Sequence, residues 1–130
     1  MTALDPRARE LAQAPNFGTL SVILRSGRPM THVMWVDADD DHVLINTESH
    51  RAKFRAVERD PRVTVTIWQR DDPYIYAEVR GEVVETVRGP EARAHIDSLS
   101  RKYRGRDYDD SAITSERVIL RIAPETVRFH

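Results

Sequence analysis

The chain has 130 residues, 40% of them hydrophobic and 32% charged, with a formal net charge of −1. These values predict a single domain over residues 1–130 with a real core. We expect a cytoplasmic protein, because no apolar run marks a membrane span or a secretory signal. The absence of cysteine excludes disulfides and cysteine-held metal sites. The near-neutral charge argues against bulk nucleic-acid binding, which requires an excess of positive charge.

The first half of the chain changes twice between helical and strand periodicity. Its predicted elements, in chain order, are a helix at 4–13, strands at 17–24, 30–36 and 42–47, and a short helix at 49–59. A turn is expected at 26–29 and an acidic turn at 37–41. Ser49 is the expected N-cap of the second helix, because its hydroxyl can accept a hydrogen bond from a free amide of the first turn.

The second half alternates between strands and one longer helix. Its predicted elements are strands at 62–68 and 74–87, a helix at 90–103 and a final strand at 116–129. Gly81 and the pair Val83-Val84 indicate a β-bulge or a sharp bend, and a break is expected at Pro124. Residues 104–115 are polar, and we expect them to be mobile.

Most of these connections have the length of hairpins, which predicts a mainly antiparallel sheet. A sheet of about six strands in so short a chain is expected to curl into a small barrel, because closure removes exposed edges. The predicted fold class is therefore mainly β, with flanking helices.

The strongest local signal for a ligand site is the run from Asn46 to Lys53, where a strand ends and a helix begins. Amides at a helix N-terminus favour an anion, and Thr47 and Ser49 add hydroxyl donors. Arg51 adds a planar guanidinium and Lys53 a point charge. These two reach one anion only if Arg51 lies in the bend before the first helical turn, because residues two apart do not share a helix face. The run fits a phosphate cradle or an ordinary capped surface helix.

Trp68 lies on the outward face of its predicted strand, and Tyr74 and Tyr76 extend that face on the next strand. We expect an interface there; a barrel that stacks single-stranded nucleic acid on these rings is the alternative. The five histidines show no metal-ligand spacing, and no P-loop, dinucleotide-binding or nucleophile motif occurs. We therefore assign no metal ligand and no catalytic residue.

The segment from Thr47 to Trp68 resembles the split-barrel flavoproteins related to pyridoxamine 5′-phosphate oxidase. The resemblance rests on Thr47 at a strand end, the pair Arg51-x-Lys53 at a helix start, and Asp60-Pro61-x-Val63 before the next strand. The order of elements fits that fold over residues 7–129. Within the superfamily the chain looks most like the short actinobacterial branch that binds the deazaflavin coenzyme F420.

The resemblance implies a six-stranded antiparallel split β-barrel of the FMN-binding type. It also implies a homodimer that holds its cofactor in a groove between the subunits. The residues implied to hold the cofactor phosphate are Thr47, Ser49, Arg51 and Lys53. Those implied to border the ring are Thr31, His32, Val33 and Asn46, with Trp68 and Tyr74 from the partner chain or the edge of the groove.

Such a cofactor carries the hydride chemistry itself, which explains why no catalytic dyad is needed. The resemblance therefore implies an F420-dependent reductase that passes hydride to a small unsaturated acceptor. An FMN-binding pyridoxamine phosphate oxidase-like protein and a non-catalytic carrier of F420 or flavin are the alternatives. Arg51, in place of a small hydroxyl residue, favours the deazaflavin, whose charged tail suits a basic pocket. No motif surrounds Arg121 or Arg128, so we assign no pyridoxal-type substrate.

Overall fold

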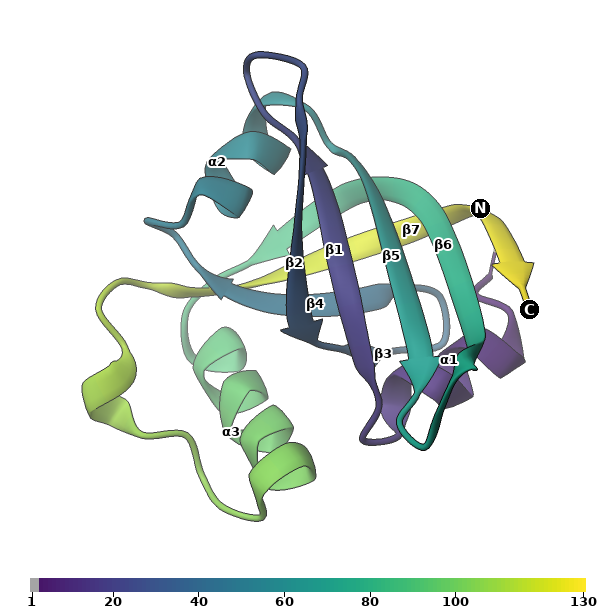
Figure 1. Ribbon diagram of the computed structural model, residues 1–130. Helices are drawn as coiled ribbons and strands as arrows, with labels where there is room; N and C mark the ends of the chain where they lie inside the picture. Colours follow the sequence, from purple (N-terminus) through teal and green to yellow (C-terminus); the bar gives the residue numbers. More distant parts are fainter. Residues whose placement is uncertain (1–2) are drawn as a thin grey trace.

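The computed structural model describes residues 3–130, which form one curled sheet with helices around it (Figure 1). The elements of this part of the chain are α1 (Pro6–Gln13), β1 (Phe17–Ile23), β2 (Pro29–Trp35), β3 (Asp37–Ala38), β4 (Val43–Glu48), α2 (Ala52–Arg59), β5 (Arg62–Gln69), β6 (Asp72–Val87), α3 (Pro90–Arg104), a short 3₁₀ helix (Asp110–Ala112) and β7 (Arg117–Phe129). None of the helices within residues 3–130 is long and apolar enough to cross a membrane.

The order of the strands forces the sheet to curl. All pairings are antiparallel, and the order β2-β1-β5-β6-β7-β4-β3 puts β2 and β3 at opposite edges. In the chain, however, only Val36 separates these two strands, so the edges must meet. Figure 1 shows the result, with β4 and β7 crossing behind β1 and β5. Among the described strands no pairing joins β2 to β4, so the barrel is split there.

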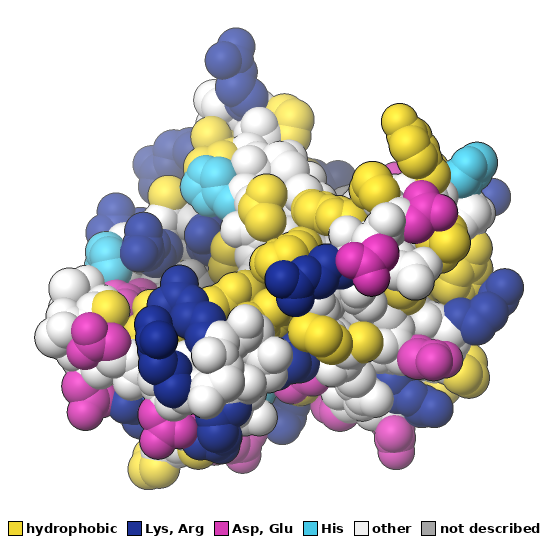
Figure 2. All heavy atoms as spheres, turned by 60° about the horizontal axis from the view of Figure 1, so that its bottom comes forward, with side chains coloured by type: hydrophobic (Ala, Val, Ile, Leu, Met, Phe, Trp, Pro, Cys, Tyr) yellow, Lys and Arg dark blue, Asp and Glu magenta, His cyan; other side chains and the backbone are white. Residues whose placement is uncertain are grey.

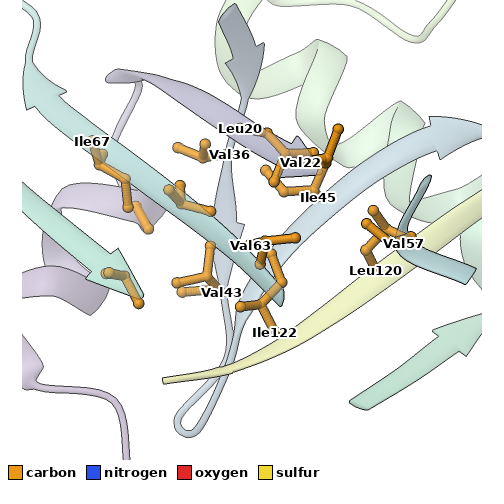
Figure 3. Packing of buried hydrophobic residues seen from close by; sticks show 14 of the residues in the cluster. Leu20, Val22, Val36, Val43, Ile45, Val57, Val63, Ile67, Leu120 and Ile122 are labelled. Atoms are coloured by element: carbon orange, nitrogen blue, oxygen red, sulfur yellow. The ribbon is translucent and has the colours of Figure 1, made fainter. Parts of the chain in front are cut away.

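Alternate residues of the strands fill the barrel interior, as Figure 3 shows. Val63, Val65 and Ile67 of β5 point inward and are at most 5% exposed, which agrees with their alternation in the sequence. Around them the same core holds Leu20, Val22, Val36, Val43, Ile45, Leu120 and Ile122. The inward faces of β1, β4, β5 and β7 therefore share one apolar interior.

The three helices cover different parts of the barrel (Figure 1). Helix α1 contacts β3, β5 and β6, and α2 contacts β1 and buries Phe54 and Val57 in the core. Helix α3 lies outside the barrel on β4 and β7, where Ala92 packs with Leu44 and Ile119. Because α3 covers its outer face, β4 is buried along its whole length, as strands covered on both faces are.

The predicted fold class, mainly β and antiparallel with flanking helices, is confirmed, but the sheet has seven strands within residues 3–130 instead of six. The additional strand, β3, lies inside the stretch predicted as an acidic turn. Asp37 and Ala38 pair with Leu44 and Val43, because the chain must cross from one edge of the sheet to the other at this point. The turn that follows is held by the Asp39 carboxylate, which accepts the amide of His42 at 2.7 Å.

Ser49 is not the N-cap of α2, contrary to the sequence prediction. The N-cap is Arg51, and no side chain among the described residues caps this helix. The reason is that Ser49 continues the edge of β4: its amide donates to the carbonyl of Glu116 at 2.9 Å. The chain then turns, with the amide of Arg51 donating to the carbonyl of Glu48 at 3.0 Å, before the helix begins.

The bulge predicted at Gly81 is confirmed, but the break predicted at Pro124 is wrong. The register of β6 on β7 shifts between Arg80 and Gly81, and Gly81 lies opposite Pro124. A Cβ atom at Gly81 would lie 2.1 Å from the carbonyl oxygen of Ala123, so this close approach requires glycine. Proline lacks the amide that a regular ladder needs, and the irregular register tolerates it there; β7 therefore runs on to Phe129.

Candidate functional site

A pocket of about 350 Å³ lies at the split between β2 and β4. It forms there because β3 pairs with β4 only at Val43 and Leu44, which leaves the later part of β4 without a strand on the side of β2. Its wall is made by Phe17, Val33, Met34, Trp35, Asn46, Thr47, Arg51, Lys53, Ile96, Leu99, Arg104, Tyr108 and Arg117. The pocket thus combines both edges of the barrel with α3 and the loop after it.

The turn between β4 and α2 brings two cations to this pocket. Arg51 has an extended backbone, with φ −72° and ψ 146°, and stands before the first turn of α2, whereas Lys53 lies within that turn. Both side chains line the same pocket. This is the geometry required for the two cations to face a single anion.

The charge of Lys53 is not balanced by an acidic group. Its half-buried ammonium lies 3.4 Å from the Met34 sulfur, and among residues 3–130 neither Lys53 nor Arg51 forms an ion pair. Burial lowers the pKa of Lys53, and the charges of Arg51 and Arg117 lower it further. A bound anion would offset this cost, so the donor set fits a phosphate or carboxylate ligand.

Aromatic rings form part of the pocket wall, namely those of Phe17, Trp35 and Tyr108. Trp35 stacks on Tyr103 with ring centres 5.2 Å apart and planes 7° apart, and Tyr108 meets Trp35 edge-on. The guanidinium of Arg104 lies over the Trp35 ring at 5.0 Å. Figure 2 shows the end of the molecule where α1 and α3 lie, with Lys and Arg side chains beside exposed hydrophobic ones. A ligand with a planar part and an anionic part suits such a surface.

Arg117 is held at the back of the pocket by a buried acid. Glu48 is its cross-strand partner and only 1% exposed; the Nη1 atom of Arg117 donates to its Oε1 at 3.1 Å. Burial would raise the pKa of Glu48, but hydrogen bonds from Thr114, Arg117 and Ser115 outweigh it and lower this pKa. Glu48 is therefore a carboxylate that positions Arg117 and ties down the loop before β7.

The structure brings half of the predicted site residues together. Those that line the pocket are Val33, Asn46, Thr47, Arg51 and Lys53. Those that lie outside it are Thr31, His32, Ser49, Trp68 and Tyr74. Thr31 and His32 are exposed on β2, Trp68 is half-buried on β5, and Tyr74 is 77% exposed at the start of β6. A role for these residues in one cofactor site needs a second copy of the chain or a ligand that extends beyond the pocket.

Several pocket residues were not predicted from the sequence. Trp35, Arg104, Tyr108 and Arg117 come from β2, α3, the loop after α3 and β7, which lie far apart in the chain. One signal was present: Arg117 is a basic residue placed immediately before the apolar run of a buried strand. The loop is anchored at Tyr108, whose amide donates to Asp97 at 2.9 Å; the mobility expected for residues 104–115 stays a prediction.

Comparison with solved structures gives close matches to this fold. A protein named F420 Reductase superimposes with a TM-score of 0.83 and 27% identity, covering 96% of this chain and 98% of that one. A conserved hypothetical protein from Mycobacterium tuberculosis, Rv2991, matches with a TM-score of 0.73 and 26% identity over 99% and 85% of the two chains. A pyridoxamine 5′-phosphate oxidase-related, FMN binding protein from Nostoc punctiforme has a TM-score of 0.66 at 13% identity, covering 95% and 83%; it is similar in fold alone.

No match was found among curated proteins. The family model described as Pyridoxamine 5′-phosphate oxidase matches residues 4–130, which is nearly the whole chain and includes every residue of the pocket. The resemblance seen in the segment from Thr47 to Trp68 is thereby confirmed, and the chain belongs to the pyridoxamine 5′-phosphate oxidase family of split-barrel proteins.

Proposed function

We propose that this protein binds coenzyme F420 in the pocket between β2 and β4 and acts as an F420-dependent reductase on a small unsaturated acceptor. The observation that carries the proposal is the set of cations in one pocket: Arg51, Lys53, Arg104 and Arg117 all line it. Within residues 3–130, only Arg117 of these four has an acidic partner. The named F420 Reductase, 27% identical over nearly the whole of both chains, supports the choice of cofactor.

The number of cations favours F420 over FMN. The negative charge of FMN comes from its single phosphate, which carries about two charges. F420 carries the carboxylates of its tail in addition to a phosphate. Arg51 and Lys53 are the proposed phosphate ligands, as the family resemblance implies, and Arg104 is available for the tail. Three uncompensated cations are better balanced by the more highly charged of the two cofactors.

The proposed reaction requires little acid–base chemistry from the protein's side chains. When bound, the deazaflavin would supply the hydride, and the protein's part is to bind, orient and exclude water. Trp35, which stacks on Tyr103, provides an aromatic wall of the pocket, and Thr47 adds a hydroxyl to the lining. These residues would hold a planar ring in one orientation without a catalytic dyad.

A homodimer is part of the proposal. The pocket volume of about 350 Å³ lies at the lower end of the range for ligand sites. F420, with its ring and its tail, would therefore extend beyond the pocket of one chain. Val33, at the pocket edge, is 65% exposed, and Tyr74 is 77% exposed. In the proposed dimer a second copy would cover these side chains and the cofactor ring where it leaves the pocket.

The binding part of the proposal is tested by titrating the purified protein with F420, FMN and riboflavin, followed by fluorescence and absorbance. Riboflavin has the ring of FMN without its phosphate and is the matched control for the cation pair. We expect F420 to bind most tightly and FMN at least tenfold more tightly than riboflavin, because charge-assisted hydrogen bonds contribute about 1.5–3 kcal/mol. Equal affinities for FMN and riboflavin would contradict a phosphate site at Arg51 and Lys53.

Turnover is tested separately from binding. The protein is loaded with reduced F420 and mixed with a panel of quinones, enones and tetrapyrroles, and the oxidation of the cofactor is followed spectroscopically. A reductase oxidises the cofactor in the presence of at least one acceptor. Tight binding without oxidation by any acceptor would instead indicate a cofactor carrier.

A further inference from the structure

A line of four polar side chains runs behind the pocket, from Arg117 on β7 to Asp37 on β3. The Nε atom of Arg117 donates to the Oδ1 atom of Asn46 at 2.8 Å, and the Nδ2 atom of Asn46 lies 3.1 Å from the Nδ1 atom of His95. The Nε2 atom of His95 lies 3.0 Å from the Oδ2 atom of Asp37. We refer to Arg117, Asn46, His95 and Asp37 as the polar chain.

The hydrogen bonds of the polar chain can run in only one direction. An arginine donates and never accepts, so the amide atom that faces it must be the oxygen of Asn46. The amide nitrogen then faces His95, and because it only donates, Nδ1 of His95 must be an acceptor without a proton. The proton of a neutral His95 therefore lies on Nε2, from which it is donated to Asp37.

Burial leaves the side chains of the polar chain without alternative hydrogen-bond partners. Asn46 is 5% exposed, and the second hydrogen of its amide donates to the carbonyl of Ala92 at 3.0 Å. The side chain of His95 is 11% exposed. Burial would raise the pKa of Asp37, but hydrogen bonds from His95 and the amide of Ala38 outweigh it and lower this pKa. The far end of the chain is thus an anion, which fixes the proton on the facing nitrogen of His95.

At the pocket end of the polar chain, the cation Arg117 is fixed in place. The guanidinium of Arg117 is held at two points, by Asn46 through Nε and by Glu48 through Nη1. Two anchors fix the plane of a guanidinium and leave its remaining donors for a ligand. Without the hydrogen bond to Asn46, the guanidinium of Arg117 could rotate about its hydrogen bond to Glu48.

We propose that His95 is a positioning residue of the cofactor site: as the neutral tautomer protonated on Nε2, it orients Asn46 and through it holds Arg117 ready for an anionic ligand. This inference rests on the proposed function, because it takes the ligand of Arg117 to be the anionic part of the cofactor. His95 itself lies outside the pocket lining, so it acts through Asn46 and not by contact.

The first test needs no cofactor. Long-range ¹H–¹⁵N spectra of the wild-type protein at pH 8 report the tautomer of each histidine, and the signals absent from His95→Gln belong to His95. We expect a protonated Nε2 and an unprotonated Nδ1. A protonated Nδ1, or signals averaged between the two tautomers, would overturn the assignment, because either result breaks the direction of the polar chain.

The second test measures the affinity for F420 and for FMN in three variants. His95→Leu removes both hydrogen bonds, and we expect it to weaken binding roughly tenfold, as the loss of one ordered hydrogen bond would. His95→Gln keeps a neutral acceptor and donor, and we expect it to restore affinity to within about threefold. The control is His42→Leu, because His42 also pairs with an aspartate, Asp39, at 3.0 Å but lies outside the pocket.

The outcomes separate this inference from the proposed function. If the wild-type protein binds neither cofactor, the proposed function fails, while the tautomer measurement still decides the direction of the polar chain. If the wild-type protein binds and His95→Leu binds equally well, the positioning role is wrong and the proposed function stands. An equal loss in His95→Leu and His42→Leu would also overturn it, because the effect would then be general destabilisation.

Discussion

Two regions of the molecule are built around the only lysines of a chain with 20 basic residues. Lys53 lies at the pocket between β2 and β4. Lys102 lies near the end of α3, where this helix meets α1 and Val36, the residue between β2 and β3. Both are half-buried, and burial lowers the pKa of each. Their surroundings differ in one respect: Lys53 is near Arg51 and Arg117, whereas Lys102 is near Asp37.

The hydrogen bonds of the two ammonium groups explain this difference. Lys102 donates to the carbonyls of Ala12 at 2.9 Å and Val36 at 2.5 Å, so it ties α3 to α1 and to the crossing between the sheet edges. Lys53 has the Met34 sulfur as its hydrogen-bond partner among the described residues. A buried cation whose donors are used by backbone carbonyls serves the fold; one surrounded by like charges is suited to bind an anion.

The largest effect that separates the two regions is expected from Lys53→Met. We expect the affinity for F420 or FMN to fall by about 1.5–3 kcal/mol, which is the contribution of a charge-assisted hydrogen bond. The free energy of unfolding should stay the same or rise slightly, because the change removes repulsion with Arg51 and Arg117. Titration and urea denaturation measure the two quantities, and unchanged affinity would remove Lys53 from the site.

Lys102→Met is the matched control and is expected to lower the free energy of unfolding more than the cofactor affinity. The free energy of unfolding should fall by about 1–2 kcal/mol, because the carbonyls of Ala12 and Val36 lose their donor. Cofactor affinity should fall less than in Lys53→Met. If the lysine at α3 proves more important for binding than Lys53, the contrast between the regions is wrong.

The same pair predicts a pH dependence of stability. Lys102 has a pKa of about 8 in the folded chain and an ordinary value of 10.5 when unfolded. Between these values the unfolded chain binds more protons, so the contribution of Lys102 to the free energy of unfolding rises with pH. The difference in stability between the wild type and Lys102→Met should therefore grow from pH 8 toward 10.5. A difference that shrinks over this range would show that burial does not lower this pKa.

The smallest effect concerns two rings outside both lysine regions, Tyr74 on β6 and Trp68 on β5. Tyr74→Ala should leave the fold intact, because Tyr74 is 77% exposed, but weaken the proposed homodimer by roughly 1 kcal/mol. Trp68→Ala should shift the dimer further toward monomer and lower cofactor affinity with it. Analytical ultracentrifugation over a range of concentrations measures both, and an intact dimer in both variants would exclude these rings from the interface.

Residues close together in the chain were predicted well, and residues brought together by packing were not. The alternation of Val63, Val65 and Ile67 predicted a half-buried strand, because periodicity is a local property. Arg51 and Lys53 could be proposed as a pair for the same reason, since one turn holds both. The pairing of Lys53 with the wall formed by Arg104 and Tyr108 could not, because it depends on where α3 packs.

The errors have the same origin. Ser49 has the right side chain for an N-cap, but the amide of Ser49 donates to the carbonyl of Glu116, the residue before β7, which moves the start of α2 past it. Asn46 and His95 are 49 residues apart, and neither belongs to a motif. Their hydrogen bond follows from the packing of α3 on the outer face of β4, which no local pattern specifies.

The most direct measurement of the central claim is a crystal structure of the protein with F420. We predict that the phosphate lies within hydrogen-bond distance, about 2.7–3.2 Å, of the Lys53 ammonium and the Arg51 guanidinium, with the ring in the split between β2 and β4. A cofactor bound elsewhere would contradict it, for example in the larger hollow of about 700 Å³ beside α1 that Arg7, Arg70 and Phe129 line.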